Sequence, residues 1–308
     1  MSFAFTGTWA AIGLAAVDGT NSVDLIIDGG QPTVISNVEG TYISTPFGLA
    51  QGDHTVILRK RSEALFGTIA IGNITTNGTF SAVAIPKRRI EIIGDSISVG
   101  YGLDGVNPCT NTAAVENNPK TYGALAAESF GAEYSVVAWS GKGMTRNYAS
   151  GSVDNSPIMP QLYSRYGAND ADGSYTFPEE TTPDVVVINL GTNDFSYLNV
   201  RPPLNSSAFT TSMVTFIQSI QKHYAKAEYF LMTSPMLNDN YPTVADAQKT
   251  TQTNALKGAI SQLNSTKVHL VEWPSQGSDV GCDYHPNAAT NVAGSKILAA
   301  AIKSVLHW

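Results

Sequence analysis

Four short segments of the chain together carry the side chains that acyl transfer needs. The segments are GDSIS (94–98), WSGKG (139–143), GTND (191–194) and GCDYHPN (281–287). Acyl transfer requires a hydroxyl nucleophile, a base that takes its proton, and hydrogen-bond donors directed at the oxygen that becomes negative. Each segment alone also reads as an ordinary turn. Their joint presence favours an active site, with Ser96 as the nucleophile and His285 as the base.

The other groups of this site follow from the same segments. His285 lies in a loop before the last helical segment, whereas the remaining histidines occur in predicted strands, in a helix or at the terminus, where a packed or surface imidazole is expected. Three donors are available for the oxyanion: the backbone amides of Ser96 and Gly141 and the side-chain amide of Asn193. A glycine at position 141 lets the backbone approach a ligand closely.

The elements that must position these residues are apolar strands alternating with amphipathic segments. The expected strands are RIEIIG (89–94), YSVVAWS (134–140), DVVVINLG (184–191), EYFLMTS (228–234) and VHLVEW (268–273). Helical spacing is clearest between Phe209 and Tyr224 and from 288 to 306. Apolar strands covered by helices on both faces form parallel sheets, so a three-layer α/β/α domain is predicted. Ligands of such sheets bind beyond the carboxyl ends of the strands.

The first part of the chain has a different pattern of apolar and polar residues. Residues 3 to 85 consist of short alternating β segments with turn signals such as Asp28-Gly29-Gly30, and no helical period occurs. This pattern predicts a β-sandwich of jelly-roll type. Because Lys87-Arg88-Arg89 follows Pro86, we expect a β domain over 1–86 and an α/β domain over 87–308.

Composition narrows the range of partners. The formal net charge of −7 and the lack of a basic stripe exclude nucleic acid and anionic membrane surfaces, and no apolar run is long enough for a membrane helix. No His, Asp and Glu cluster has metal-ligand spacing, so neither a metal nor another cofactor is expected. Few charged residues and four Asn-x-Ser/Thr sequons favour a secreted protein whose signal, if it had one, has been removed. A monomer is expected.

The four segments resemble those of the SGNH hydrolase superfamily, also called GDSL-type esterases. The sequence is most similar to carbohydrate esterase family 2. The similarity lies in the segments IGDSISVGYG, AWSGKGMTRNY, PDVVVINLGTNDF and GCDYHP and in the β domain that precedes them. The resemblance implies a flavodoxin-like sheet behind a jelly roll. It also implies the roles already given to Ser96, Gly141, Asn193 and His285. The implied activity is removal of acetyl groups from plant polysaccharides such as xylan and glucomannan, with preference for 6-O-acetyl groups.

One position departs from the superfamily pattern. Many members have an aspartate three residues before the histidine, where this chain has Cys282, and Asp283 lies two residues before it. We expect the Asp283 carboxylate to orient the imidazole. The alternative is a Ser-His dyad in which a backbone carbonyl takes the place of the aspartate. Cys109 and Cys282 are either two free thiols or a disulfide that tethers the loop after Ser96 to the loop of His285.

Aromatic and acidic residues near the segments are candidates for sugar contacts. Tyr101, Trp139 and Tyr284 have flat faces that match a pyranose ring, although core packing is an equal alternative for Trp139. Asp194 is expected either to bind a sugar hydroxyl or to cap the segment that follows it. The expected function is therefore a cofactor-free serine esterase acting on acetylated polysaccharide or oligosaccharide. The alternatives are a lipase or lysophospholipase, or a carbohydrate-binding protein without activity.

Overall fold

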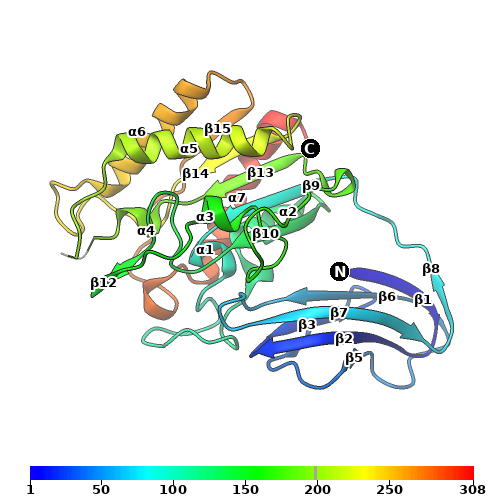
Figure 1. Cartoon of the computed structure of the whole chain (residues 1–308). Helices are drawn as coiled ribbons and strands as arrows, with labels where there is room; N and C mark the ends of the chain where they lie inside the picture. The colour runs from blue at the N-terminus through cyan, green and yellow to red at the C-terminus, as the bar shows by residue number, and fades with distance from the viewer. Residues whose placement is uncertain (198–199) are drawn as a thin grey trace.

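The computed structural model describes residues 1–197 and 200–308 and contains a β-sandwich followed by an α/β unit (Figure 1). The sandwich is made of two antiparallel sheets with strand orders β4-β3-β6-β1-β8 and β5-β2-β7. Its strands are β1 (Ser2–Gly7), β2 (Ala10–Gly19), β3 (Val23–Ile27), β4 (Thr33–Ile35), β5 (Tyr42–Ser44), β6 (Gly52–Lys60), β7 (Gly67–Thr76) and β8 (Thr79–Ser81). Both the sandwich and the α/β layers that were predicted are confirmed.

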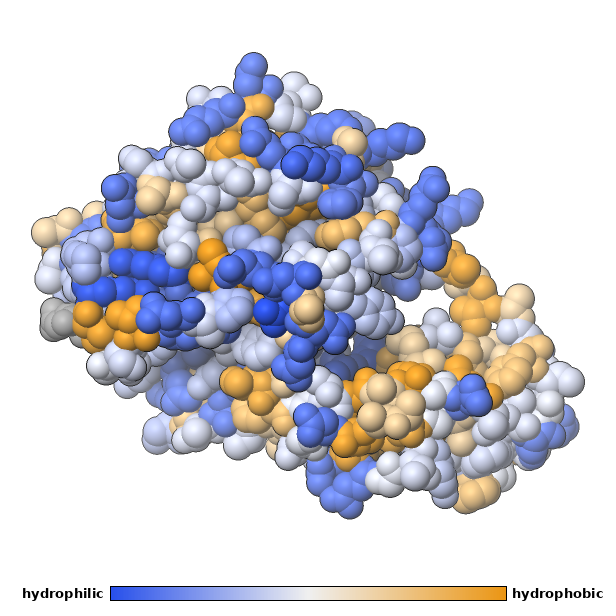
Figure 2. Space-filling view, in the orientation of Figure 1, coloured by the Kyte–Doolittle hydropathy of each residue, from blue (hydrophilic) through white to orange (hydrophobic). Residues whose placement is uncertain are grey.

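Alternation of apolar and polar residues builds the sandwich. Inward-facing side chains such as Phe5, Ile12, Val56 and Leu58 form one core between the two sheets. The predicted turn at 28–30 joins β3 to β4, with Asp28 and Gly29 at positive φ (51° and 67°). Figure 2 shows apolar residues gathered over the sandwich, whereas hydrophilic residues cover much of the α/β unit on the same face.

The α/β unit contains a parallel sheet of five strands in the order β10-β9-β13-β14-β15. These strands are β9 (Arg89–Gly94), β10 (Glu133–Ala138), β13 (Val185–Asn189), β14 (Glu228–Met232) and β15 (Val268–Val271). All five match the strands predicted from the sequence. A small hairpin, β11 (Ala149–Ser150) and β12 (Ser152–Val153), lies in the long connection after β10.

Helices cover both faces of this sheet. They are α1 (Ser96–Val99), α2 (Tyr122–Ser129), α3 (Met159–Leu162), α4 (Thr192–Phe195), α5 (Ser206–Gln221), α6 (Gln248–Leu263) and α7 (Ala288–Leu306), with short 3-10 helices at Asn118–Lys120, Glu179–Thr181 and Cys282–Tyr284. Side chains from α3, α5 and α6 share one core with the sheet, and side chains from α2 and α7 share the other. Among the described residues, no helix is long and apolar enough to cross a membrane.

Strand register places the chemistry at one edge of the sheet. Gly94 at the end of β9 pairs with Ala138 of β10 and with Asn189 of β13. The three strands therefore end side by side, and the residues that follow them emerge at the same edge.

Candidate active site

Ser96 lies on a one-turn helix that begins directly after β9. Asp95 caps this helix, because its Oδ1 accepts a hydrogen bond from the backbone N–H of Ile97 (3.0 Å). Gly94 is required here, since a Cβ at this position would come within 2.0 Å of Ser98 Oγ. The turn is therefore tight, and it presents Ser96 at the edge of the sheet with 4% of its surface exposed.

His285 reaches Ser96 from a loop 189 residues further along the chain. Its Nε2 lies 2.9 Å from Ser96 Oγ, and its Nδ1 lies 3.1 Å from the backbone carbonyl oxygen of Asp283. A carbonyl oxygen only accepts, so Nδ1 carries the proton and Nε2 accepts from the serine hydroxyl. Burial lowers the pKa of His285 to about 4. The imidazole is consequently neutral near pH 7, as a base must be.

Asp283 differs from the expectation that its carboxylate orients the imidazole. The backbone carbonyl makes that contact, which was the alternative, and Asp283 Oδ2 instead accepts a hydrogen bond from the Tyr101 hydroxyl (2.8 Å). The reason is local: Asp283 and Tyr284 both have positive φ (49° and 63°), in a turn that brings the Asp283 carbonyl back to the ring of His285. The histidine and its partner thus come from one short segment.

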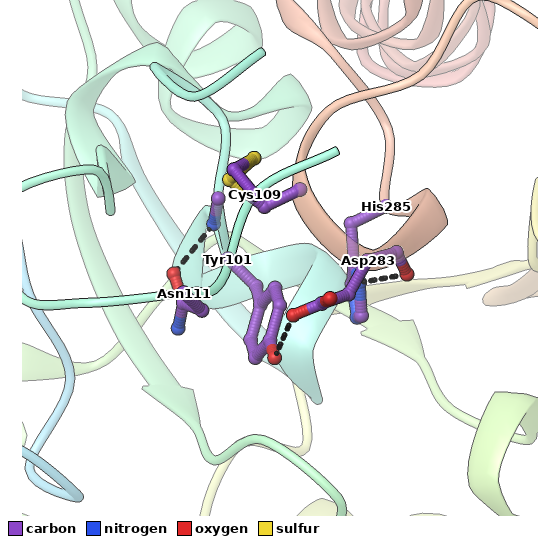
Figure 3. Close-up of a disulfide and its surroundings, with 7 residues drawn as sticks. Tyr101, Cys109, Asn111, Asp283 and His285 are labelled. Atoms are coloured by element: carbon purple, nitrogen blue, oxygen red, sulfur yellow. Dashed lines mark hydrogen bonds between the residues drawn. A yellow bond between two sulfur atoms is a disulfide. The ribbon is translucent and has the colours of Figure 1, made fainter. Parts of the chain in front are cut away.

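Tyr101 also contacts the base directly. Its ring stacks on the imidazole of His285, with 4.0 Å between the ring centroids and 24° between the planes. Figure 3 shows Tyr101 beside Asp283 and His285, with its hydroxyl directed at the carboxylate. Tyr101 was predicted as a sugar contact, and the structure places it as a support of the histidine.

The disulfide between Cys109 and Cys282 is present, with 4.8 Å between the two Cα atoms. It joins the loop after Ser96 to the residue next to Asp283, as expected if the two cysteines pair. The loops lie so close that a Cβ at Gly102 would come within 2.3 Å of the Cβ of Cys282. The Cys282 side chain is fully buried, so the bridge is part of the wall behind the base.

The three predicted oxyanion donors lie around the same edge. Within the described part of the chain, the backbone N–H groups of Ser96 and Gly141 have no hydrogen-bond partner. Asn193 Nδ2 donates to the carbonyl oxygen of Lys142 (2.8 Å) and, at the longer distance of 3.3 Å, to Oδ2 of Asp95. Asn193 therefore holds the loop that contains Gly141, and its longer contact is the one a ligand oxygen would compete with.

Asp95 was not assigned a role from the sequence, although it belongs to the first segment. It is fully buried, and burial raises its pKa to about 7. One oxygen caps the helix of Ser96 and the other approaches Asn193. An aspartate directly before a short helix is a capping signal, and this signal was available in the sequence.

The structure gives Asp194 neither of the two roles expected from the sequence, a sugar contact or a helix cap. The side chain is fully buried and accepts hydrogen bonds from the backbone N–H groups of Met144 (2.8 Å), Thr145 (2.6 Å) and Arg146 (3.2 Å). Such a carboxylate is not available to a sugar, and it does not cap its own segment. It fixes the loop after Gly141 instead.

The remaining two aromatic candidates lie in different environments. Trp139 is half-buried against the core that α3, α5 and α6 share with the sheet, and it lines a cavity of about 750 Å³ between the sandwich and the α/β unit. Neither Ser96 nor His285 lines that cavity. Tyr284 is 70% exposed and directly precedes the base. Of the three aromatic candidates, Tyr284 is the exposed one.

Both parts of the chain match known families. Residues 1–86 match the model "Carbohydrate esterase 2 N-terminal", and residues 92–293 match the "GDSL-like Lipase/Acylhydrolase family". A crystal structure of a carbohydrate esterase family 2 enzyme plus carbohydrate binding domain from Corynascus thermopiles (Myceliophthora fergusii) is 67% identical, with a TM-score of 0.97 over 100% of this chain and 93% of that chain. A family two carbohydrate esterase from Clostridium thermocellum, in complex with cellohexaose, is 30% identical, with a TM-score of 0.84 over 100% of this chain and 92% of that one.

Curated relatives give the same assignment. The acetylxylan esterase / glucomannan deacetylase of Cellvibrio japonicus is 33% identical over 88% of this chain and 74% of its own length. Cellulase/esterase CelE of Acetivibrio thermocellus is 32% identical over 99% of this chain, which spans only 36% of that larger protein. The chain belongs to carbohydrate esterase family 2, within the GDSL-like lipase and acylhydrolase family.

Proposed function

We propose that the protein is a serine esterase that removes O-acetyl groups from plant cell-wall polysaccharides such as xylan and glucomannan. The observation that carries this proposal is the 2.9 Å contact between Ser96 Oγ and a neutral His285 whose other ring nitrogen is held by the Asp283 carbonyl. A serine, a neutral imidazole in the right tautomer and nearby free amide donors are the parts that ester cleavage requires.

The reaction would run through an acetyl-enzyme. Ser96 Oγ attacks the ester carbonyl carbon while His285 Nε2 takes the hydroxyl proton. The tetrahedral intermediate then expels the sugar oxygen, which receives that proton from Nε2. Water, deprotonated by the same nitrogen, attacks the acetyl carbonyl carbon. The bond to Ser96 Oγ then breaks, Nε2 returns the proton to that oxygen, and acetate leaves.

The oxyanion would be bound by the backbone N–H groups of Ser96 and Gly141 and by Asn193 Nδ2. Asn193 would exchange its 3.3 Å contact with Asp95 for the shorter contact with the oxyanion. Losing one such donor typically costs about 3 kcal/mol of transition-state stabilisation, so each of the three would contribute measurably.

The substrate class rests on the relatives and on the surface of the site. The Cellvibrio japonicus relative is named for acetylxylan and glucomannan, and the Clostridium thermocellum relative was crystallised with cellohexaose. A net charge of −7 suits a neutral polysaccharide better than an acidic one. Tyr284, exposed beside His285, is the proposed sugar contact. We also propose a secreted monomer with domains over 1–86 and 87–308, and the disulfide favours an oxidising compartment.

Acetate release tests this function directly. The protein is incubated with acetylated xylan and with acetylated glucomannan, and NMR follows which acetyl positions are lost. We expect acetate from both polymers, with 6-O-acetyl groups lost first, and no release by Ser96→Ala. Absence of release from either polymer, with p-nitrophenyl acetate still cleaved, would redirect the proposal to another ester class.

A further inference from the structure

A residue of the β-sandwich reaches the predicted oxyanion loop, defined here as residues 139–143. Glu63 lies in the connection between β6 and β7, and only 6% of its surface is exposed. Its Oε2 accepts a hydrogen bond from the backbone N–H of Ser140 (2.8 Å). This contact fixes the Trp139–Ser140 peptide, which directly precedes the Ser140–Gly141 peptide that carries the Gly141 N–H.

Glu63 is itself held by the α/β unit. Its backbone N–H donates to Oε2 of Glu116 (2.7 Å), and Oε1 of Glu116 accepts from Nδ2 of Asn111 (2.7 Å). Oδ1 of Asn111 in turn accepts from the backbone N–H of Gly102 (2.8 Å), a contact drawn in Figure 3. This chain of contacts links Glu63 to the loop that follows Tyr101.

Burial raises the pKa of both glutamates in this cluster, whereas the contacts of Glu63 act in the opposite direction. Burial, followed by the proximity of Glu63, raises the pKa of Glu116 to about 8, so Glu116 is protonated near neutral pH. Glu63, whose pKa burial also raises, receives the Ser140 N–H and lies near the Lys60 ammonium, and both contacts stabilise its charged form. The bond to the Ser140 N–H needs an acceptor oxygen at this reach, which a carboxylate and an amide both provide.

The other contacts of the oxyanion loop show why this bond matters. Gly141 has a φ of 78°, and its carbonyl accepts from the backbone N–H of Tyr148 (2.7 Å). The Lys142 carbonyl accepts from Asn193 (2.8 Å). These bonds hold the loop after the Gly141 nitrogen. Glu63 holds it before that nitrogen.

We propose that Glu63 is a positioning residue, contributed by the sandwich, that holds the Trp139–Ser140 peptide. It thereby orients the next peptide, Ser140–Gly141, so that the Gly141 N–H faces the carbonyl oxygen of an ester attacked by Ser96. The inference rests on the proposed function, and it gives the β domain a part in the active site. Glu63 touches neither the nucleophile nor the base in this assignment.

Three substitutions of Glu63 and one control test the proposal. Glu63→Ala removes the acceptor, Glu63→Asp keeps the charge but withdraws it by one methylene, and Glu63→Gln keeps both the reach and an acceptor oxygen. The control is Arg59→Ala, which removes another contact between the two units, the Arg59–Glu128 ion pair at 3.9 Å. Cleavage of p-nitrophenyl acetate gives kcat and KM. Hydrogen exchange of the amides of residues 139–143 reports on the loop without requiring activity.

We expect kcat to fall about tenfold or more in Glu63→Ala and Glu63→Asp with KM within about twofold of the parent, because a misdirected donor weakens transition-state binding. Exchange in the oxyanion loop should accelerate in the same two variants. Glu63→Gln should keep most of kcat, and Arg59→Ala should match the parent in both measurements. If Glu63→Ala fails to fold, kcat and amide exchange of Glu63→Asp test the proposal.

Parental kcat and parental exchange in Glu63→Ala or Glu63→Asp would overturn the proposal. An equal loss in Arg59→Ala would do the same, since it would show a general effect of loosening the two units. A kcat of Glu63→Gln as low as that of Glu63→Ala would also overturn the proposal. A parent protein without esterase activity would instead reject the proposed function, and the exchange measurement would still decide whether Glu63 holds the loop.

Discussion

His285 shows how a single residue is prepared for base chemistry without an acidic partner on its ring. The Asp283 carbonyl fixes the tautomer, and the stacked ring of Tyr101 fixes the plane of the imidazole. A full negative charge beside the ring would raise its pKa, whereas a neutral carbonyl does so less. The dyad therefore combines a correctly oriented imidazole with a low pKa.

The pH dependence of the esterase should reflect this low pKa. Burial favours the neutral imidazole and lowers the pKa of His285 to about 4, so the base is already competent at mildly acidic pH. We expect kcat/KM for p-nitrophenyl acetate to rise with pH through a midpoint near the pKa of about 4 and then to stay level through pH 7. An ordinary histidine would place the midpoint near its usual pKa, about 6.5.

Stability must be followed over the same range. A histidine whose folded pKa is lowered resists protonation only while folded, so its contribution to stability is lost as pH falls below the unfolded value of about 6.5. The far-ultraviolet circular dichroism of the protein at each pH separates this effect from catalysis. A midpoint at pH 6 or above in protein that remains folded would contradict the assignment.

At the scale of elements, some helices and strands could be predicted from the sequence and others could not, for physical reasons that differ. The five parallel strands and α5 were predictable because apolar runs and helical spacing mark them. Helix α6 was not, because its buried face includes Gln248 and Gln252, and the Gln252 side-chain amide donates to the Leu190 carbonyl. The burial of Asp194 was missed for a related reason. A buried polar side chain is stabilised by hydrogen-bond partners from distant segments, and no local sequence pattern predicts those partners.

The disulfide between Cys109 and Cys282 keeps the loop of His285 beside the loop that follows Ser96. It closes a loop with a sequence separation of 173 residues. We expect Cys109→Ser combined with Cys282→Ser to lower the free energy of unfolding by up to about 5 kcal/mol, mainly because the unfolded chain regains freedom. We also expect kcat to fall, because the turn of Asp283 and His285 loses its tether. Urea titrations and p-nitrophenyl acetate kinetics measure the two effects.

A reducing agent gives the matched control for this variant. Reduction of the parent should reproduce both losses, and the same treatment should leave the double serine variant unchanged. An unchanged kcat in the variant would show that the bridge stabilises the fold without positioning the base.

At the scale of the whole molecule, the two units share buried charges as well as surface. Arg61 follows β6 of the sandwich, is 4% exposed, and forms ion pairs with Asp24 of the sandwich and with Asp104 of the α/β unit. Asp104 lies in the loop between Tyr101 and Cys109, so this pair and the Glu63 contact bring one sandwich segment against two loops of the site. Neither contact has a sequence pattern, because both join residues of separate units.

Replacing Arg61 should therefore destabilise the protein far more than replacing its neighbour Arg59. Arg61→Met leaves Asp24 buried without its partner, at 5% side-chain exposure, and we expect a loss of about 3–5 kcal/mol in the free energy of unfolding. Arg59→Ala removes an exposed pair, 28% and 61% exposed at its two side chains, and should cost less than about 1 kcal/mol. Urea unfolding of both variants, followed by tryptophan fluorescence, makes the comparison. If the sandwich and the α/β unit unfold cooperatively, Arg61→Met shifts one transition. A loss no larger than that of Arg59→Ala would mean that Asp24 and Asp104 find other partners when Arg61 is gone.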